Sequence, residues 1–223
     1  MTTRLSVVML GASGAVGSHV VGTLLAMPQL AGLSLLNRRR LDLPSDARLR
    51  QHVVDVLAPP SYRHLLAGHR AAVCTLGVGE PSKIGKAEFV RIDKDAVLDF
   101  ARACKEAGIE HFELLGSVGA DPGSASFYLR TKGELERDLE ALGFARLSLF
   151  RPSMILTPTN RYGFTQAMTL AVWPRLNPLL QGSWRRYRGI PVASLGAAMA
   201  RNLAVPGAGV EVLQWDDFMK LTT

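Results

Sequence analysis

The sequence predicts an α/β fold built on a doubly wound parallel sheet, and two observations carry this prediction. Short apolar runs typical of buried strands alternate with longer segments whose apolar residues recur at helical spacing. The first apolar run, residues 7–10, leads into a glycine-rich loop and then into a helical segment. With 223 residues and 48% hydrophobic content, the chain can bury a substantial core.

Strand and helix signals follow one another in a regular order. Gly108 and Gly143 each follow a helical pattern, where glycine commonly ends the helix. Pro59 and Pro60 end the third strand, because proline cannot donate a hydrogen bond to a neighbouring strand. This order implies right-handed crossovers, with ligands bound beyond the carboxyl ends of the strands. The residues expected at this edge are Gly11, Asn37, Asp55, Thr75, Ser117 and Pro152. The predicted strands are residues 7–10, 33–36, 51–56, 71–76, 111–115, 145–150 and 210–214, and the predicted helices are residues 18–27, 62–67, 86–107, 126–142, 163–172 and 193–203, with a short terminal helix after them.

One domain is expected over residues 1–223, with a small C-terminal elaboration on the substrate side of the sheet. Residues 155–190 are expected to form this elaboration, either as a lid over a substrate or as an interface between two copies. An apolar group within the segment suits both interpretations, because such a patch must be covered. Its members are Phe164, Met168, Leu170, Val172 and Trp173.

The first loop carries three glycines between the strand and the helix. Gly11 allows the tight turn out of the strand, Gly14 lets phosphates approach the backbone, and Gly17 lets the helix pack closely on the sheet. The spacing is G-x-x-G-x-x-G, not the more familiar G-x-G-x-x-G, but the flanking strand and helix supply the Rossmann-like context. Backbone N–H groups at such a helix start bind the pyrophosphate of a dinucleotide. The predicted cofactor contacts here are Gly11, Ser13, Gly14, Ala15, Val16 and Gly17.

The end of the second strand indicates which dinucleotide binds. An NAD site usually carries Asp or Glu about 20 residues after the glycine loop, where the carboxylate holds the ribose 2′-hydroxyl. Here that position is Asn37, followed by Arg38, Arg39 and Arg40. An amide does not repel a 2′-phosphate, and a guanidinium binds one through charge-assisted hydrogen bonds. Asn37, Arg38 and Arg39 therefore predict NADP(H); the alternative is that the arginines form a solvated loop.

A tyrosine and a lysine four residues apart carry the predicted chemistry. Tyr128 and Lys132 share one face of the helix expected at 126–142, and Ser117 lies at the end of the preceding strand. An ammonium beside a phenol favours the phenolate form, which suits the phenol to proton transfer at a carbonyl or alcohol oxygen. The serine hydroxyl can hold the same oxygen. The alternative is a helix-surface pair without a catalytic role, and the dinucleotide loop in the same chain favours the catalytic interpretation.

These residues give the sequence a resemblance to a known family. It resembles the atypical short-chain dehydrogenase/reductases, and most closely the branch that contains the Tat-interacting-protein oxidoreductase and its bacterial relatives. The matching segments are residues 11–17, 89–93, 111–121, 127–134 and 150–152. The resemblance implies catalytic places for Ser117, Tyr128 and Lys132, contact of Lys132 with the nicotinamide ribose, of Asp55 with adenine, of Gly77 with the adenosine side, and of Pro152 and Ser153 with the nicotinamide side.

The predicted function is hydride transfer between NADP(H) and a carbonyl or alcohol of a small molecule. The asparagine that many short-chain reductases use in a proton relay has no clear counterpart in the helix expected at 86–107. An NADP(H)-binding redox-sensing regulatory protein with little or no turnover is therefore the alternative. An epimerase or dehydratase that retains its cofactor is a third.

Composition argues against several other classes. The net charge of +7 would suit nucleic acid, but no helix-turn-helix, zinc-finger or RNA-binding signature accompanies it. The apolar stretch 5–27 has the length of a membrane span, yet a buried strand, glycine loop and helix account for it. The histidines lack metal-ligand spacing, and Cys74 and Cys104 predict free thiols. The sequence therefore predicts a cytoplasmic monomer or homodimer with no metal, no specific nucleic-acid partner and no membrane.

Overall fold

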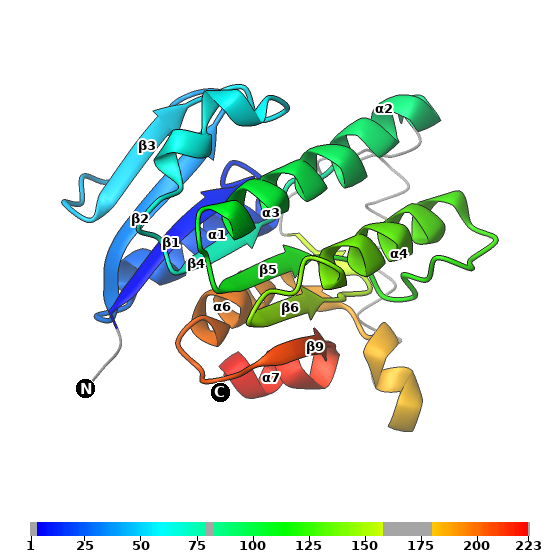
Figure 1. The fold of residues 1–223 in the computed structure, drawn as a ribbon. Helices are drawn as coiled ribbons and strands as arrows, with labels where there is room; N and C mark the ends of the chain where they lie inside the picture. The colour runs from blue at the N-terminus through cyan, green and yellow to red at the C-terminus, as the bar shows by residue number, and fades with distance from the viewer. Residues whose placement is uncertain (1–3, 79–82, 158–179, 223) are drawn as a thin grey trace.

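The fold is organised around a parallel sheet, as the sequence predicts. This computed structural model describes residues 4–78, 83–157 and 180–222, and within them seven strands form one sheet in the order β3-β2-β1-β4-β5-β6-β9 (Figure 1). Every neighbouring pair is parallel. Because the order reverses between β1 and β4, a ligand site is expected beyond the carboxyl ends of these two strands. The strands are β1 (Leu5–Leu10), β2 (Leu30–Asn37), β3 (Leu49–Val53), β4 (Ala71–Cys74), β5 (His111–Leu115), β6 (Arg146–Phe150) and β9 (Gly209–Leu213).

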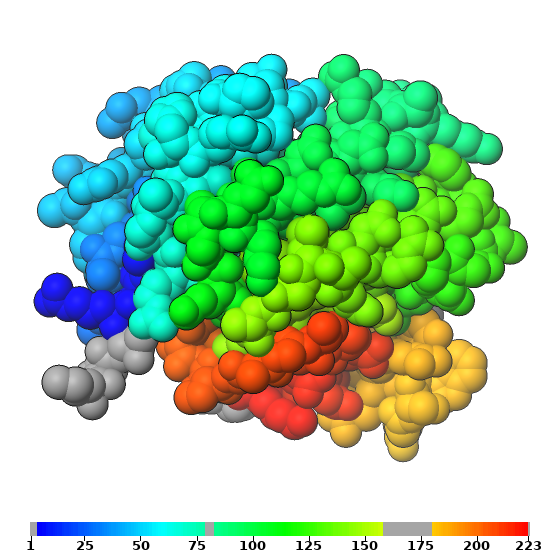
Figure 2. Space-filling view, viewed as in Figure 1, coloured from blue at the N-terminus to red at the C-terminus, as the bar shows by residue number. Residues whose placement is uncertain are grey.

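Helices cover both faces of this sheet. One face is covered by α1 (Ala15–Ala26), α6 (Val192–Asn202) and α7 (Trp215–Thr222), and the other by α3 (Ala96–Glu106) and α4 (Phe127–Glu140) (Figure 1). In Figure 2, the side chains of α3 and α4 form the centre of this face, and those of β9 lie below them, next to α7. The two-sided covering confirms the doubly wound arrangement.

The central strand β1 shows why the sheet could be predicted from apolar runs. Val7 and Met9 belong to the core under α1 and α6, while Val8 and Leu10 belong to the core under α3 and α4. All four side chains are fully buried. A parallel strand with helices on both faces needs apolar residues at consecutive positions, not at alternating ones.

Two predicted helices differ in detail. The helix predicted over 86–107 consists of α2 (Lys86–Val90), a π-helical turn (Arg91–Asp95) and then α3. The helix predicted over 62–67 is replaced by two short 3₁₀ turns, which are Pro59–Ser61 and Arg63–Leu65. Proline favours the first position of such a turn, so the turn begins earlier than the apolar pattern indicates.

Much of the expected substrate-side elaboration lies outside the described residues, including the helix predicted at 163–172 and its apolar group. The described ends of this region meet in a short parallel pair, β7 (Ile155–Leu156) with β8 (Ile190–Pro191). Sequence analysis missed this pair because strands of two residues show no periodicity. A 3₁₀ segment, Gly182–Tyr187, precedes β8.

A polar network is buried among β5, β6, β9 and α6. Asn202 Nδ2 donates to Glu113 Oε1 at 2.9 Å, and His111 Nε2 lies 2.7 Å from Ser148 Oγ. The second oxygen, Glu113 Oε2, has no hydrogen-bond partner within the described segments. Burial raises the pKa of Glu113 well above its usual range and lowers the pKa of His111 to about 3. Burial therefore favours the neutral forms of both side chains in the folded protein.

Neutral His111 and protonated Glu113 predict a stability plateau between pH 6.5 and pH 4.5, the ordinary pKa values of the two groups. Within this interval the folded and unfolded pairs each bind one proton, so their contributions to the pH dependence cancel. Above the plateau the folded pair holds the extra proton, and stability falls as pH rises, by up to about 1.4 kcal/mol per pH unit. Below it the unfolded pair takes up the extra proton, and stability falls as pH falls.

Glu113→Gln is expected to flatten the alkaline arm of this profile, because the amide binds no proton in either state. Urea unfolding at a series of pH values from the plateau upward measures the slope in both proteins. The variant keeps an oxygen that can accept from Asn202, so it tests the proton and not the hydrogen bond. An unaltered alkaline slope would show that Glu113 is ionised in the folded protein.

Candidate functional site

The glycine loop between β1 and α1 has the geometry predicted from the sequence. Gly11 has a φ of +94°, a conformation that favours glycine, and the Gly14 N–H donates to Gly11 O at 3.0 Å. A Cβ on Gly17 would lie 2.3 Å from Gly11 O and 2.9 Å from Thr75 Oγ1. The tight turn at Gly11 and the close helix packing at Gly17 are thus confirmed. The Thr75 hydroxyl donates to Gly11 O at 3.0 Å and fixes the loop to the end of β4.

The amino end of α1 suits an anion. Its N-cap residue, Gly14, supplies no side-chain cap, and the first turn carries no acidic residue. The first N–H groups of a helix, here those of Ala15, Val16 and Gly17, have no carbonyl partner within the helix. These donors and the positive end of the helix dipole fit the pyrophosphate of a dinucleotide.

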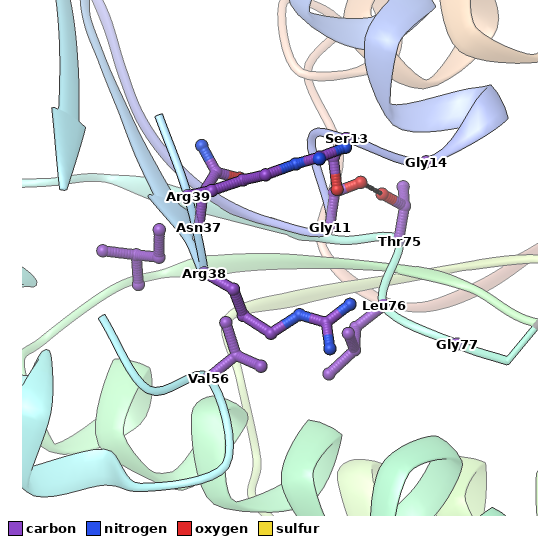
Figure 3. Close-up of a pocket in the computed structure, with 11 residues that line it drawn as sticks. Gly11, Ser13, Gly14, Asn37, Arg38, Arg39, Val56, Thr75, Leu76 and Gly77 are labelled. Atoms are coloured by element: carbon purple, nitrogen blue, oxygen red, sulfur yellow. Dashed lines mark hydrogen bonds between the residues drawn. The ribbon is translucent and has the colours of Figure 1, made fainter. Parts of the chain in front are cut away.

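A cavity of about 530 Å³ lies beside this loop, at the carboxyl ends of the central strands (Figure 3). The predicted residues that line it are Gly11, Ser13, Gly14, Asn37, Arg38, Arg39 and Gly77. The other lining residues are Leu36, Val56, Thr75 and Leu76; the sequence places Thr75 at the ligand-binding edge but does not assign the other three. Each of these four is among the last two residues of a predicted strand. A location at the carboxyl end of a strand therefore indicates that a residue lines the site.

Asn37 and two arginines form the polar wall of the cavity. Asn37 is 5% exposed, and its Nδ2 has no hydrogen-bond partner among the residues that the structure describes. A buried donor without a partner costs about 1–3 kcal/mol, so a bound acceptor would stabilise this position. Arg38 and Arg39 are exposed; Figure 3 shows Arg39 extending toward Ser13 and Arg38 toward Leu76. The wall offers donors and positive charge, which fits a phosphorylated ligand.

Other predicted cofactor contacts lie outside this cavity. Asp55 is exposed, and its carboxylate accepts the backbone N–H two residues further on at 3.0 Å. Its neighbour Val56 forms the cavity wall instead. Pro152 and Ser153 follow β6, and Pro152 O accepts from Val118 N–H at 2.9 Å, which joins the loops after β5 and β6.

The start of α4 positions Tyr128 and Lys132. The Ser126 hydroxyl caps the helix by accepting a first-turn N–H at 3.5 Å. The ring of Tyr128 is half-buried, with its centroid 5.6 Å from that of Phe89. Lys132, one turn later, is 5% exposed, and its Nζ donates to Asp93 Oδ1 at 2.7 Å.

The loop that carries Ser117 is held against the same helix. Asp121 N–H donates to Leu129 O at 3.2 Å, and a Cβ on Gly133 would lie 2.2 Å from the Asp121 carbonyl carbon. The Ser117 hydroxyl is half-buried, and its one hydrogen bond in the described part of the chain is a long contact of 3.3 Å with Val118 O. The predicted catalytic residues therefore come from two segments that are packed together.

A second ion pair on α4 joins Glu136 to Arg151, which follows β6. Arg151 Nε donates to Glu136 Oε2 at 2.9 Å. Burial raises the pKa of Glu136, and the Arg151 guanidinium opposes this shift. A Cβ on Gly116 would lie 2.6 Å from the other carboxylate oxygen. The residue before Ser117 is therefore packed closely against α4, and a side chain there would require the Glu136 carboxylate to move.

Asp93 is a candidate that sequence analysis missed. It is 2% exposed and lies in the π-helical turn, facing Lys132. The sequence contains a pattern that predicts its burial, because Asp93 falls at the helical spacing of the core residues Phe89, Val97 and Phe100. A carboxylate at a core position needs a buried partner, and the sequence does not reveal which residue provides it.

The described residues also bear on metal ligands, membrane-spanning helices and reactive thiols. Within them, no group of three or more His, Cys, Asp or Glu side chains is arranged to hold a metal ion. Over the same segments, no helix has the length and apolar character to cross a membrane. Both cysteines are free and buried, and burial raises the pKa of Cys74 to about 12, so this thiol is not a nucleophile at neutral pH.

Comparison with known proteins agrees with the geometry of the loop. A family model described as NAD(P)H-binding matches residues 11–167. Protein HTATIP2 from Rattus norvegicus is 37% identical over 212 residues, which cover 94% of this chain and 86% of that protein. Protein FMP52, mitochondrial, from Saccharomyces cerevisiae is 29% identical over 197 residues, which cover 82% of this chain and 80% of that protein.

Solved structures confirm the Rossmann-like fold. MoeE5 in complex with UDP-glucuronic acid and NAD matches with a TM-score of 0.69 and 20% identity, over 93% of this chain and 75% of that one. DesIV, a dTDP-glucose 4,6-dehydratase from Streptomyces venezuelae with NAD bound, matches with a TM-score of 0.69 and 18% identity, over 96% of this chain and 78% of that one. With the glycine loop, the family match and the 37% identical relative in agreement, the chain belongs to the NAD(P)H-binding family and is a relative of Protein HTATIP2.

Proposed function

We propose that this chain is an NADP(H)-dependent oxidoreductase that transfers a hydride to or from a carbonyl or alcohol of a small molecule. The observation that carries the choice of cofactor is the unpartnered Nδ2 of Asn37 beside Arg38 and Arg39 in the cavity. In this proposal the guanidinium groups pair with the 2′-phosphate, and the amide donates a further hydrogen bond. A carboxylate at position 37 would instead favour NAD, by accepting hydrogen bonds from the free ribose.

The other proposed cofactor contacts follow the carboxyl edge of the sheet. The N–H groups at the start of α1 hold the pyrophosphate. Asp55 and Gly77 lie on the adenosine side, and Pro152 and Ser153 lie on the nicotinamide side. The hydrogen bond between the loops after β5 and β6 supports this placement, because it brings Pro152 next to the segment of Ser117.

The proposed chemistry needs one proton and one hydride. Bound NADPH supplies the hydride to the carbonyl carbon. The Tyr128 hydroxyl donates its proton to the carbonyl oxygen during reduction and accepts one during oxidation, while Ser117 donates a hydrogen bond to the same oxygen. Lys132 holds the nicotinamide ribose and places a positive charge near the phenol.

In this proposal, residues 155–190 form a lid over the substrate or a contact between two copies of the chain. In support, the segment begins and ends at the same place, where Ile190 N–H donates to Met154 O at 2.9 Å. The proposed protein is a single domain that acts in the cytoplasm as a monomer or homodimer. Fractionation of cells is the direct test of location, since the fungal relatives are named as mitochondrial.

Replacing both Arg38 and Arg39 with alanine is expected to remove most of the preference for NADPH over NADH. Each charged hydrogen bond to the 2′-phosphate contributes about 1.5–3 kcal/mol, so NADPH binding weakens by about 100-fold or more while NADH binding changes little. Calorimetry with both cofactors measures the ratio. Arg40→Ala is the matched control, because Arg40 is also exposed but does not line the cavity. An NADPH/NADH affinity ratio that survives the double substitution would refute the cofactor assignment.

A further inference from the structure

The strongest unassigned feature of the site is the carboxylate of Asp93, which binds two separate segments. Asp93 Oδ1 accepts from Lys132 Nζ at 2.7 Å, and Oδ2 accepts from the Val78 backbone N–H at 2.8 Å. Lys132 belongs to α4, whereas Val78 belongs to the loop that follows β4. Asp93 thus connects this loop directly to the proposed catalytic lysine.

Packing alone does not explain a carboxylate at this position. The side chains of Asp93 and Lys132 are only 3% and 6% exposed, and removing two charges from water carries a large desolvation penalty. Apolar residues of similar volume often stabilise a fold as well as or better than a buried ion pair. The neighbouring core positions on the same helix, such as Phe89 and Val97, are apolar.

The backbone around Asp93 is shaped to receive both contacts. A π-helical turn spans Arg91–Asp95, and such turns widen the helix locally and often occur at functional sites. A Cβ on Gly77 would lie 3.0 Å from Asp93 Oδ1. The carboxylate therefore approaches the Gly77 backbone at a distance that leaves little room for a side chain, and Gly77 itself lines the cavity.

We propose that Asp93 is the positioning residue of Lys132 and that it couples the cofactor-side loop at Gly77 and Val78 to this lysine. The inference rests on the proposed function, in which Lys132 holds the nicotinamide ribose. Asp93 binds one of the three ammonium protons, which restricts the directions of the other two. The same carboxylate binds the loop, so a movement of the loop on cofactor binding is transmitted to Lys132.

A neighbouring ion pair provides a matched control. Lys94 Nζ lies 2.6 Å from Glu134 Oε2, and this contact joins the same π-helical turn to the same helix. It differs in that the ion-pair partners of Lys94 within the described segments are Glu134 and Asp138, not Asp93 or the loop after β4. Lys94→Gln therefore weakens the packing of the two elements without removing the positioning contact.

The test is a double-mutant cycle read as the dissociation constant of NADPH, with Asp93→Asn and Lys132→Met alone and combined. Asp93→Asn is expected to weaken NADPH binding about tenfold in the wild-type background, the size of a lost charged hydrogen bond, and to have almost no effect when Lys132 is already methionine. Lys94→Gln is expected to change binding by about threefold or less. If Lys132→Met does not fold, which thermal unfolding would show, Lys132→Leu takes its place, because leucine also removes the donor to Asp93.

Turnover supplies a second readout with any carbonyl compound that the protein reduces. Asp93→Asn should lower kcat by about tenfold and leave the KM of the carbonyl compound nearly unchanged, since Lys132 does not bind that substrate. Equal effects of Asp93→Asn in both backgrounds, or an effect of Lys94→Gln as large as that of Asp93→Asn, would overturn the coupling and leave the proposed function intact. A wild-type protein that binds neither NADPH nor NADH would instead refute the proposed function, and the coupling with it.

Discussion

Replacing Tyr128 with phenylalanine is expected to lower NADPH-dependent carbonyl reduction by about 100- to 10,000-fold, the usual contribution of a positioned general acid. The substitution removes the hydroxyl that would donate the proton and keeps the ring, which lies 5.6 Å from the ring of Phe89. NADPH binding should therefore stay within about twofold of the wild-type value. A panel of aldehydes, ketones and quinones, with NADPH absorbance as the signal, measures turnover, and calorimetry measures binding.

Tyr62→Phe is the matched control for this experiment. Tyr62 is also a tyrosine beside a phenylalanine ring, with centroids of Tyr62 and Phe100 6.0 Å apart, but it lies in the core away from the cavity. Its hydroxyl is buried and has no hydrogen-bond partner within the described segments. Removing it should leave turnover unchanged and stability equal or slightly higher.

The two outcomes separate the enzyme from its alternative. Turnover that persists in Tyr128→Phe would show that the Tyr128 hydroxyl is not the proton donor. Tight NADPH binding by the wild-type protein, without reduction of any compound in the panel, would favour the redox-sensing regulatory protein. Only the enzyme requires the hydroxyl, because the phosphate loop serves both functions equally.

The sheet could be predicted because burial on two faces leaves a signal within each strand. All seven strands of the main sheet were expected from apolar runs, and β5 has the predicted bounds. The sequence predicts the edge strand β3 at 51–56, whereas the strand spans Leu49–Val53. None of its side chains is buried, so the apolar signal comes from Val54 and Val56, which follow the strand and pack on the core.

The phosphate loop and the arginines could be predicted because they are consecutive in the chain. Local spacing determines which backbone groups lie at the start of α1, whatever the rest of the fold does. The partner of Lys132 could not be predicted in this way. Asp93 is 39 residues away, and the π-helical turn shifts the register of the side chains that follow it.

Gly17→Ala is expected to damage both the fold and the cofactor site, whereas Gly22→Ala on the same helix is expected to stabilise the protein. The added methyl at Gly17 would lie 2.3 Å from Gly11 O and 3.0 Å from Ala12 Cα, so α1 and the loop must separate. Overpacking of this kind costs about 1–3 kcal/mol, and a shift of the loop that breaks one hydrogen bond to the pyrophosphate weakens NADPH binding by about tenfold or more.

The added methyl at Gly22 meets no atom within 4 Å. Alanine there improves helix propensity by about 0.5–1 kcal/mol and leaves NADPH binding unchanged. Urea unfolding and calorimetry on the two variants separate the loss of close packing from a general effect of alanine in α1. If Gly17→Ala binds NADPH as tightly as Gly22→Ala does, the approach of helix to loop is not what shapes the phosphate site.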